Sequence, residues 1–113
     1  MNHFLLRYLI LIIIGSSINL CDFEIRDLCT WMNVDDTDEF DWLLNIGPTE
    51  TPNTGPSIDH TFGTSSGTYI FIRGSNPAKE GWRAQLYSEP IADSRPACIS
   101  FWFHAYGSVC FVV

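Results

Sequence analysis

The sequence predicts an all-β domain, because three features of the chain agree. Short apolar and aromatic runs alternate with segments rich in Gly, Pro, Ser and Thr, which is the pattern of a β-sandwich or barrel. Pro48, Pro52 and Pro56 fall within residues 48–67, and each proline restricts its own backbone and that of its predecessor, so this stretch is predicted as loop. No segment after residue 20 shows a helical apolar period of useful length.

The N-terminal 20 residues are predicted as a helical secretory signal peptide. Arg7 precedes an apolar run at 8–14, and small residues occupy positions 15–17. We expect cleavage between residues 17 and 20, which leaves a domain at 21–113. The apolar run is shorter than the roughly 20 residues that cross a bilayer, so a membrane anchor is the less favoured alternative.

The predicted domain is acidic. Removing the signal peptide takes away its one charged residue, Arg7, and changes the formal net charge from −7 to −8. Nucleic acid is excluded as a partner, because binding to phosphates requires a basic surface. Acidic clusters usually form a solvated surface, and six of the acids here lie close together in sequence: Asp35, Asp36, Asp38, Glu39, Asp41 and Glu50.

Five segments have the composition of β-strands. Residues 42–46 come first, and residues 68–73 follow with β-branched and aromatic side chains between two glycines. Residues 82–87 alternate between apolar and polar side chains. Residues 97–106 form the longest run, and because both of its faces are apolar we expect a central strand. A further strand is predicted to begin at 109–113.

The chain resembles the MAM domain, an extracellular module of meprins, neuropilins and receptor-type tyrosine phosphatases. The motifs that carry the resemblance follow the family's order and spacing. They are Cys-x-Phe-Glu at 21–24, Leu-Cys-x-Trp at 28–31, Asp-Glu-Phe-Asp-Trp at 38–42, Thr-Gly-Pro to Asp-His-Thr at 54–61, Gly-x-Tyr-Ile-Phe-Ile at 67–72, Ala-x-Leu to Ser-x-Pro at 84–90, and Cys-Ile-Ser-Phe-Trp-Phe-His-x-Tyr-Gly at 98–107.

The resemblance implies a jelly-roll β-sandwich that is secreted and not enzymatic. Its implied role is adhesion or recognition of an extracellular protein, including a second copy of the chain. Domains of this family are longer, so we expect residues 21–113 to be a partial, C-terminally truncated sandwich that oligomerises through exposed strand edges. The alternative is the N-terminal fragment of a larger secreted protease or receptor.

The resemblance also implies a disulfide between Cys21 and Cys29. The family partner of Cys98 belongs to the missing part of the domain. If residues 107 and 108 form a hairpin turn, Cys98 lies roughly 23 Å along its strand from the residue opposite Cys110, and on the other face. We therefore expect Cys98 and Cys110 to be unpaired or to form intermolecular bridges.

A structural calcium or sodium ion is the one cofactor that the resemblance implies. Some members of the family hold such an ion near the start of the domain. Glu24 and Asp59 are the best oxygen donors in the matching segments, and Asp41 is the third. An EF-hand is excluded, because Phe40 and Gly47 occupy positions of the loop beginning at Asp36 that require oxygen ligands.

No catalytic site is expected. His60 and His104 are the only histidines after the predicted signal peptide, and no nucleophile-elbow or zinc-protease motif occurs. The aromatic residues could form a sugar-binding platform, but aromatic residues at strand periodicity normally belong to the core. These residues are Trp31, Trp42, Phe71, Phe101 and Phe103.

Overall fold

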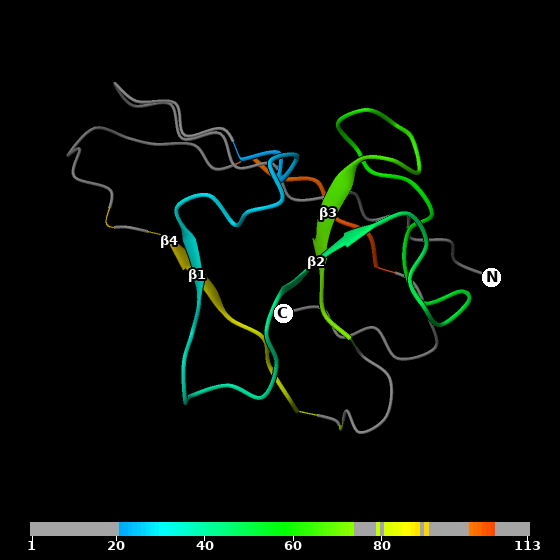
Figure 1. Cartoon of the computed structure of the whole chain (residues 1–113). Coiled ribbons are helices and arrows are strands. Elements are labelled where there is room, and N and C mark those ends of the chain that lie inside the picture. The colour runs from blue at the N-terminus through cyan, green and yellow to red at the C-terminus, as the bar shows by residue number, and fades with distance from the viewer. Residues whose placement is uncertain (1–20, 74–78, 80, 89, 91–99, 106–113) are drawn as a thin grey trace.

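The computed structural model describes residues 21–73, 79, 81–88, 90 and 100–105 (Figure 1). The predicted signal peptide lies outside these residues. So do Cys98, Cys110 and the strand predicted to begin at residue 109.

Four short strands form two antiparallel sheets of two strands each. β1 (Trp31–Asn33) pairs with β4 (Leu86–Ser88), and β2 (Leu43–Ile46) pairs with β3 (Thr68–Phe71) (Figure 1). The part of the chain that the structure describes contains no helix that could cross a membrane, and all of its regular elements are strands. The all-β prediction is therefore confirmed.

The predicted strands at 42–46 and 68–73 are confirmed as β2 and β3. Only the last two residues of the predicted strand at 82–87 belong to a strand, because β4 begins at Leu86. Before β4, Ala84 forms an isolated bridge with Phe40. β1 was not predicted, because it has only three residues and no alternating pattern.

The prediction of a central strand over 97–106 is wrong for the residues that the structure describes there. Residues 100–105 lie in no strand, and the side chains of Phe101, Trp102 and Phe103 are exposed. A strand requires neighbouring strands for its backbone hydrogen bonds, and the two described sheets contain none beside this segment. Instead, the ring of Trp102 stacks on that of His60, with centroids 4.2 Å apart.

One face of the β2–β3 sheet carries three apolar side chains and one threonine. Leu44 pairs with Ile70 and Ile46 pairs with Thr68, so these four side chains share a face. Leu44 and Ile46 keep 36% and 38% of their surface exposed. Ile72, two residues beyond Ile70, is also exposed. The opposite face carries Tyr69, which is buried.

Side-chain contacts join the two sheets. Asn33 in β1 donates from Nδ2 to the carbonyl of Trp42 (3.1 Å) and accepts the N–H of Trp42 at Oδ1 (2.8 Å), just before β2. The indole Nε1 of Trp42 donates to the carbonyl of Ala84 (3.3 Å). The rings of Phe40 and Trp82 pack edge to face with centroids 5.1 Å apart. These contacts fix the start of β2 against the segment that leads to β4.

The N-terminal part of the domain is closed by the disulfide between Cys21 and Cys29. The pairing that the resemblance implied is therefore confirmed. By chain-entropy arithmetic, a loop of this length contributes about 2–3 kcal/mol to the free energy of unfolding. Cys21 and Phe23 are both buried, so the loop packs its own side chains into the core.

Gly67 lies against the carboxyl group of Asp59. A Cβ atom at position 67 would be 2.1 Å from Asp59 Cγ and 2.3 and 2.5 Å from its two oxygens. Asp59 is 1% exposed and accepts backbone N–H groups, so it has little freedom to move away. The close approach of these two residues therefore requires glycine at position 67.

We predict that Gly67→Ala lowers the free energy of unfolding by about 3 kcal/mol, the upper end for overpacking a core. Denaturant unfolding followed by tryptophan fluorescence measures the loss. Gly63→Ala is the control, because a Cβ there meets nothing within 4 Å. The control should cost about 1 kcal/mol through its positive φ. Equal losses in the two variants would contradict the requirement for glycine at position 67.

Candidate functional site

Asp59 organises the loop that precedes β3. Its Oδ2 accepts the N–H of Phe62 (2.6 Å) and its Oδ1 accepts the N–H of Thr64 (2.9 Å). The N–H of Asp59 donates in turn to the carbonyl of Thr64 (3.0 Å). A short side chain that accepts nearby backbone donors is a common way to fix a turn. Here it holds residues 59–64 in a closed loop around a buried carboxylate.

Glu24 joins the disulfide loop to the first residue of β3. Both carboxylate oxygens accept the N–H of Thr68, at 3.1 and 3.2 Å. Glu24 follows Phe23, whose left-handed backbone (φ 65°) and buried ring turn the chain within the loop closed by Cys21 and Cys29. The disulfide loop therefore delivers a carboxylate to the point where β3 begins.

Asp59 lies against Gly67 and Glu24 accepts the N–H of the next residue, Thr68, so the two carboxyl groups influence each other's pKa; they are here called the carboxyl pair. Burial raises the pKa of Glu24 above its usual range; the N–H of Thr68 opposes this shift, and the charge of Asp59 adds to it. Burial also acts to raise the pKa of Asp59, but the N–H groups of Phe62 and Thr64 outweigh it, so the pKa of Asp59 is lowered. Two carboxyl groups with opposite shifts hold one proton between them over a range of pH.

The structure brings together two of the three predicted cation ligands. Glu24 and Asp59 are in contact, whereas Asp41 lies in the loop between β1 and β2 with the acidic cluster. Among the described residues, no group of three or more His, Cys, Asp or Glu side chains is arranged to hold a metal ion. The carboxyl pair would supply only two side chains to a cation, whereas calcium takes six to eight oxygen atoms.

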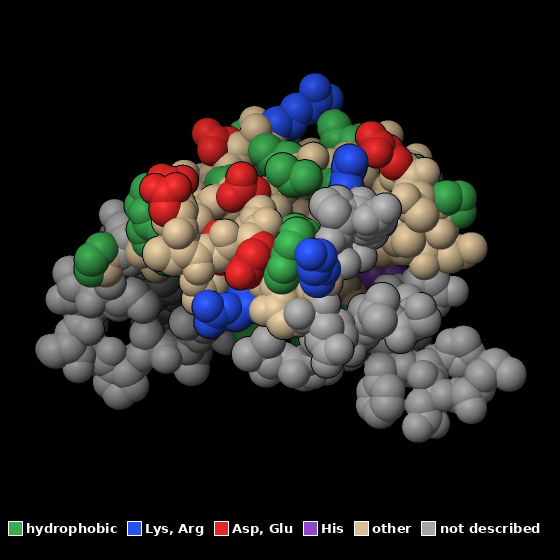
Figure 2. All heavy atoms as spheres, turned by 90° about the horizontal axis from the view of Figure 1, so that it is seen from below, with side chains coloured by type: hydrophobic (Ala, Val, Ile, Leu, Met, Phe, Trp, Pro, Cys, Tyr) green, Lys and Arg blue, Asp and Glu red, His purple; other side chains and the backbone are tan. Residues whose placement is uncertain are grey.

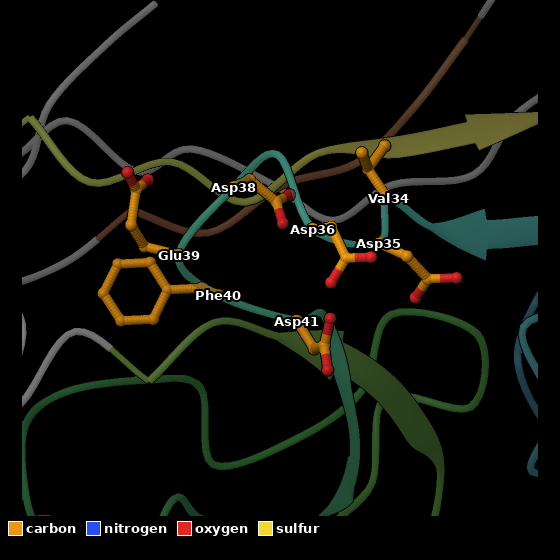
Figure 3. A pocket seen from close by; sticks show the side chains of 7 residues that line it. All are labelled: Val34, Asp35, Asp36, Asp38, Glu39, Phe40 and Asp41. Carbon is orange, nitrogen blue, oxygen red and sulfur yellow. The ribbon is translucent and has the colours of Figure 1, made fainter.

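A second acidic feature is the loop between β1 and β2. Its residues line a hollow of about 250 Å³ with five carboxylates (Figure 3). Two of these have structural roles: Asp38 accepts the N–H of Gln85 (2.6 Å), and Glu39 accepts the N–H of Arg83 (2.9 Å). The attachment of the loop to the segment before β4 therefore accounts for two of its five carboxylates.

Figure 2 shows a face of the molecule on which acidic, basic and hydrophobic side chains are interspersed.

The sequence pointed to Glu24 and Asp59 only through a resemblance, and it did not indicate Gly67 or Thr68 as their partners. Both act through the backbone: Gly67 by its lack of a side chain and Thr68 by its N–H. One sequence signal could have indicated them. A glycine directly before a predicted strand, here Gly67 before the strand that contains Tyr69, often marks a close approach between the backbone and another group. His104 is not part of this pair; burial lowers its pKa.

The pH dependence of stability tests the carboxyl pair. The pKa of Glu24 is raised above 4.5. Its contribution to the free energy of unfolding is therefore present at low pH and is lost as the pH rises through the pKa of the folded state. Because the pKa of Asp59 is lowered below 3.8, its contribution is present above that value and is lost as the pH falls through its folded pKa.

We expect Glu24→Gln to remove the loss of stability that accompanies the ionisation of Glu24 as the pH rises. The reason is that an uncharged amide can accept the N–H of Thr68 and donate to Asp59 at any pH. The Tm of Glu24→Gln relative to the wild type should therefore rise between about pH 4 and pH 7, as measured by circular dichroism. Glu39→Gln, an exposed counterpart in the acidic loop, should follow the wild-type profile. Parallel profiles for Glu24→Gln and the wild type would show that the ionisation of Glu24 does not affect the stability of the fold.

Comparison with known proteins places the chain in a family. The family model described as MAM domain, meprin/A5/mu, matches residues 21–110. Human MAM domain-containing glycosylphosphatidylinositol anchor protein 1 is 42% identical over 95 residues, which cover 79% of this chain and 10% of that protein. Mouse MAM domain-containing glycosylphosphatidylinositol anchor protein 2 is 40% identical over 100 residues, which cover 77% of this chain and 10% of that protein.

The chain thus spans about a tenth of the length of these relatives. No solved structure matches it. The family model, however, covers the whole disulfide loop, both sheets and the carboxyl pair. The chain therefore belongs to the MAM domain family.

Proposed function

We propose that this chain is an extracellular, non-enzymatic recognition module that binds another protein at a cell surface. The observation that carries the proposal is the MAM family match over residues 21–110. The names of the relatives describe membrane-anchored MAM proteins and mention no catalytic activity. The Cys21–Cys29 disulfide supports an oxidising compartment, in line with the predicted signal peptide. We also infer that the two described sheets are parts of a jelly-roll β-sandwich.

The apolar face of the β2–β3 sheet is the surface that suits such a role. Leu44, Ile46 and Ile72 are exposed on or beside this face, and each keeps more than a third of its surface accessible. Apolar side chains that gather on an exposed face favour protein association. Ile70 lies between them and is half-buried, so the face is continuous along the sheet.

A bead and cell assay tests the recognition role. The full chain, secreted from animal cells and coupled to beads, should make the beads cluster or attach to cells. Clustering indicates a second copy as the partner, and attachment alone indicates a different surface protein. The double variant Leu44→Asp, Ile46→Asp should lower this binding at least about tenfold, because it places charges in a desolvated contact.

Ile25→Asp is the matched control for this assay. Ile25 is 75% exposed in the disulfide loop and does not belong to the β2–β3 sheet. Its substitution should leave binding unchanged. If wild-type beads neither cluster nor attach, or if Ile25→Asp lowers binding as much as the double variant does, the proposed role of the face is wrong.

The second candidate function is that of an N-terminal fragment of a larger secreted protease or receptor. It is favoured by the small share of each relative, 10%, that the chain spans. Sequencing of full-length transcripts distinguishes the two. A reading frame that continues into further domains supports the fragment, and a stop codon after Val113 supports the separate module.

We propose in addition that the carboxyl pair takes up a calcium or sodium ion at neutral pH. A cation would relieve the repulsion between the buried carboxylate of Asp59 and the half-buried carboxylate of Glu24 when both are ionised. Glu24 and Asp59 would be its side-chain ligands, and backbone carbonyls or water would supply the other oxygen atoms. The ion would then hold the disulfide loop against the loop at 59–64.

Thermal unfolding at pH 7.4 tests the ion. Millimolar calcium should raise the Tm of the wild type relative to a chelator, because a ligand that binds only the folded chain stabilises it. Glu24→Gln should abolish the increase, and Asp41→Asn, in the acidic loop, should keep it. An increase that depends on Asp41 and not on Glu24 would place the ion in the acidic loop instead.

A further inference from the structure

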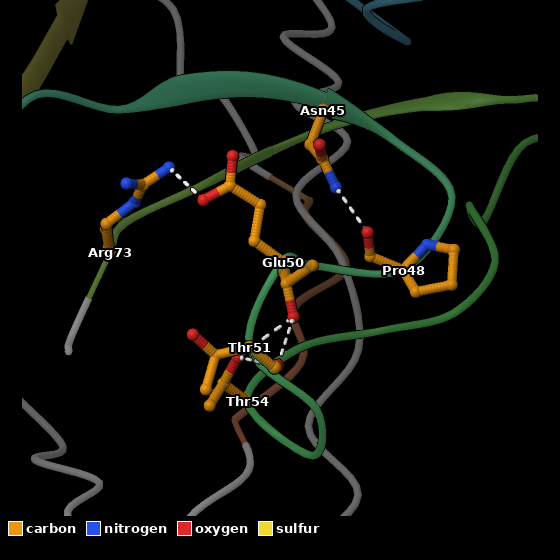
Figure 4. A network of polar contacts seen from close by, with 7 residues as sticks. Asn45, Pro48, Glu50, Thr51, Thr54 and Arg73 are labelled. Carbon is orange, nitrogen blue, oxygen red and sulfur yellow. Dashed lines mark hydrogen bonds and ion pairs between the residues drawn. The ribbon is translucent and has the colours of Figure 1, made fainter.

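The loop between β2 and β3 carries an exposed turn at residues 51–54. Pro52 occupies its second position, and Asn53 has a left-handed backbone (φ 62°) at the third, which together are the signature of a type II turn. The hydroxyl of Thr54 donates to the carbonyl of Thr51 (2.6 Å) and closes the turn (Figure 4). All four residues of the turn are exposed.

The three threonines around this turn differ in what their hydroxyl groups do. Thr49 donates to the carbonyl of Thr51 (3.2 Å), and its hydroxyl lies 2.9 Å from the hydroxyl of Thr54. The methyl group of Thr49 is packed so closely on Gly55 that a Cβ there would be 2.5 Å away. Thr49 and Thr54 therefore hold the turn, whereas the hydroxyl of Thr51 makes no hydrogen bond to any other described residue.

The surroundings of Thr51 resemble an acceptor segment for a sugar transferase. Pro48 and Pro52 remove backbone donors and restrict the backbone on both sides of Thr51, and Ser/Thr-rich segments with proline are typical sites of O-glycosylation. The one charge beside Thr51 is Glu50, whose carboxylate pairs with Arg73 at 3.0 Å (Figure 4). The segment therefore presents the unbonded hydroxyl of Thr51 next to a carboxylate whose charge is balanced by Arg73.

We propose that Thr51 is an O-glycosylation site that accepts an N-acetylhexosamine. Thr51 Oγ1 attacks C1 of a nucleotide-activated N-acetylhexosamine, and a bond forms between Oγ1 and C1. The bond between C1 and the diphosphate oxygen breaks, the nucleoside diphosphate leaves, and the hydroxyl proton passes to solvent. In the cell this step rests on the export that the proposed function requires, because the transferases reside in the secretory pathway.

The decisive experiment does not depend on export. The full chain with its disulfide formed is incubated with a Golgi membrane extract and a uridine-diphosphate N-acetylhexosamine that carries an isotope label. Peptide mass spectrometry then locates the label. We expect it on Thr51, with Thr51→Val lowering incorporation at least about tenfold. Thr61→Val, which removes another exposed hydroxyl from a segment without a neighbouring proline, should keep full incorporation.

Pro52→Ala keeps the acceptor hydroxyl and should also lower incorporation, which separates recognition of the turn from the mere presence of Thr51. A chain that takes up no label, or takes it up equally in the wild type and Thr51→Val, overturns the proposal. Expression of the full chain in a secretory host tests export separately. A secreted chain that carries the sugar on Thr51 supports both proposals, and a chain labelled in the extract but retained in cells argues against export alone.

Discussion

The buried carboxylate of Asp59 is the constraint on which the described structure depends. An ionised carboxylate without partners in a protein interior is very costly, so its N–H donors and the contact with Glu24 are conditions for folding rather than additions to it. Phe62 and Thr64 supply the donors from the same loop. Glu24 supplies the contact from a segment more than 30 residues earlier, which couples the disulfide loop to the strand that follows Gly67.

The two sheets are too small to be stable alone, because an isolated two-stranded sheet is marginal in water. Their stability therefore depends on contacts between them. Asn33 and Trp42 provide these with three hydrogen bonds that connect β1, the start of β2 and the segment before β4. At the start of β3, the carboxyl pair connects the disulfide loop to the strand in a similar way. Side chains rather than a continuous backbone ladder hold this part of the domain together.

Local pattern in the sequence was sufficient for β2 and β3, since both are continuous apolar runs that end at turn residues. It was insufficient for β1, where Asn33 serves a tertiary contact to Trp42 instead of an alternating surface. It misled for residues 100–105, because an apolar run predicts burial only if neighbouring strands exist to cover it. For the site, the resemblance pointed to Glu24 and Asp59, whereas the backbone roles of Gly67 and Thr68 appear only in the distances of the folded chain.

The opposite pKa shifts of the carboxyl pair connect stability with the proposed environment of the domain. At neutral pH the raised pKa of Glu24 means that ionising it costs folding energy, and a bound proton or a bound cation can offset that cost. An extracellular fluid is poor in protons and rich in sodium and calcium ions, so a cation is the stabiliser that this compartment would supply. In an acidic vesicle, a proton on Glu24 would take the place of the ion and hold the disulfide loop beside Asp59. If the proposed cation binds, proton and cation are alternatives at one position, and either would preserve the connection between the N-terminal loop and β3.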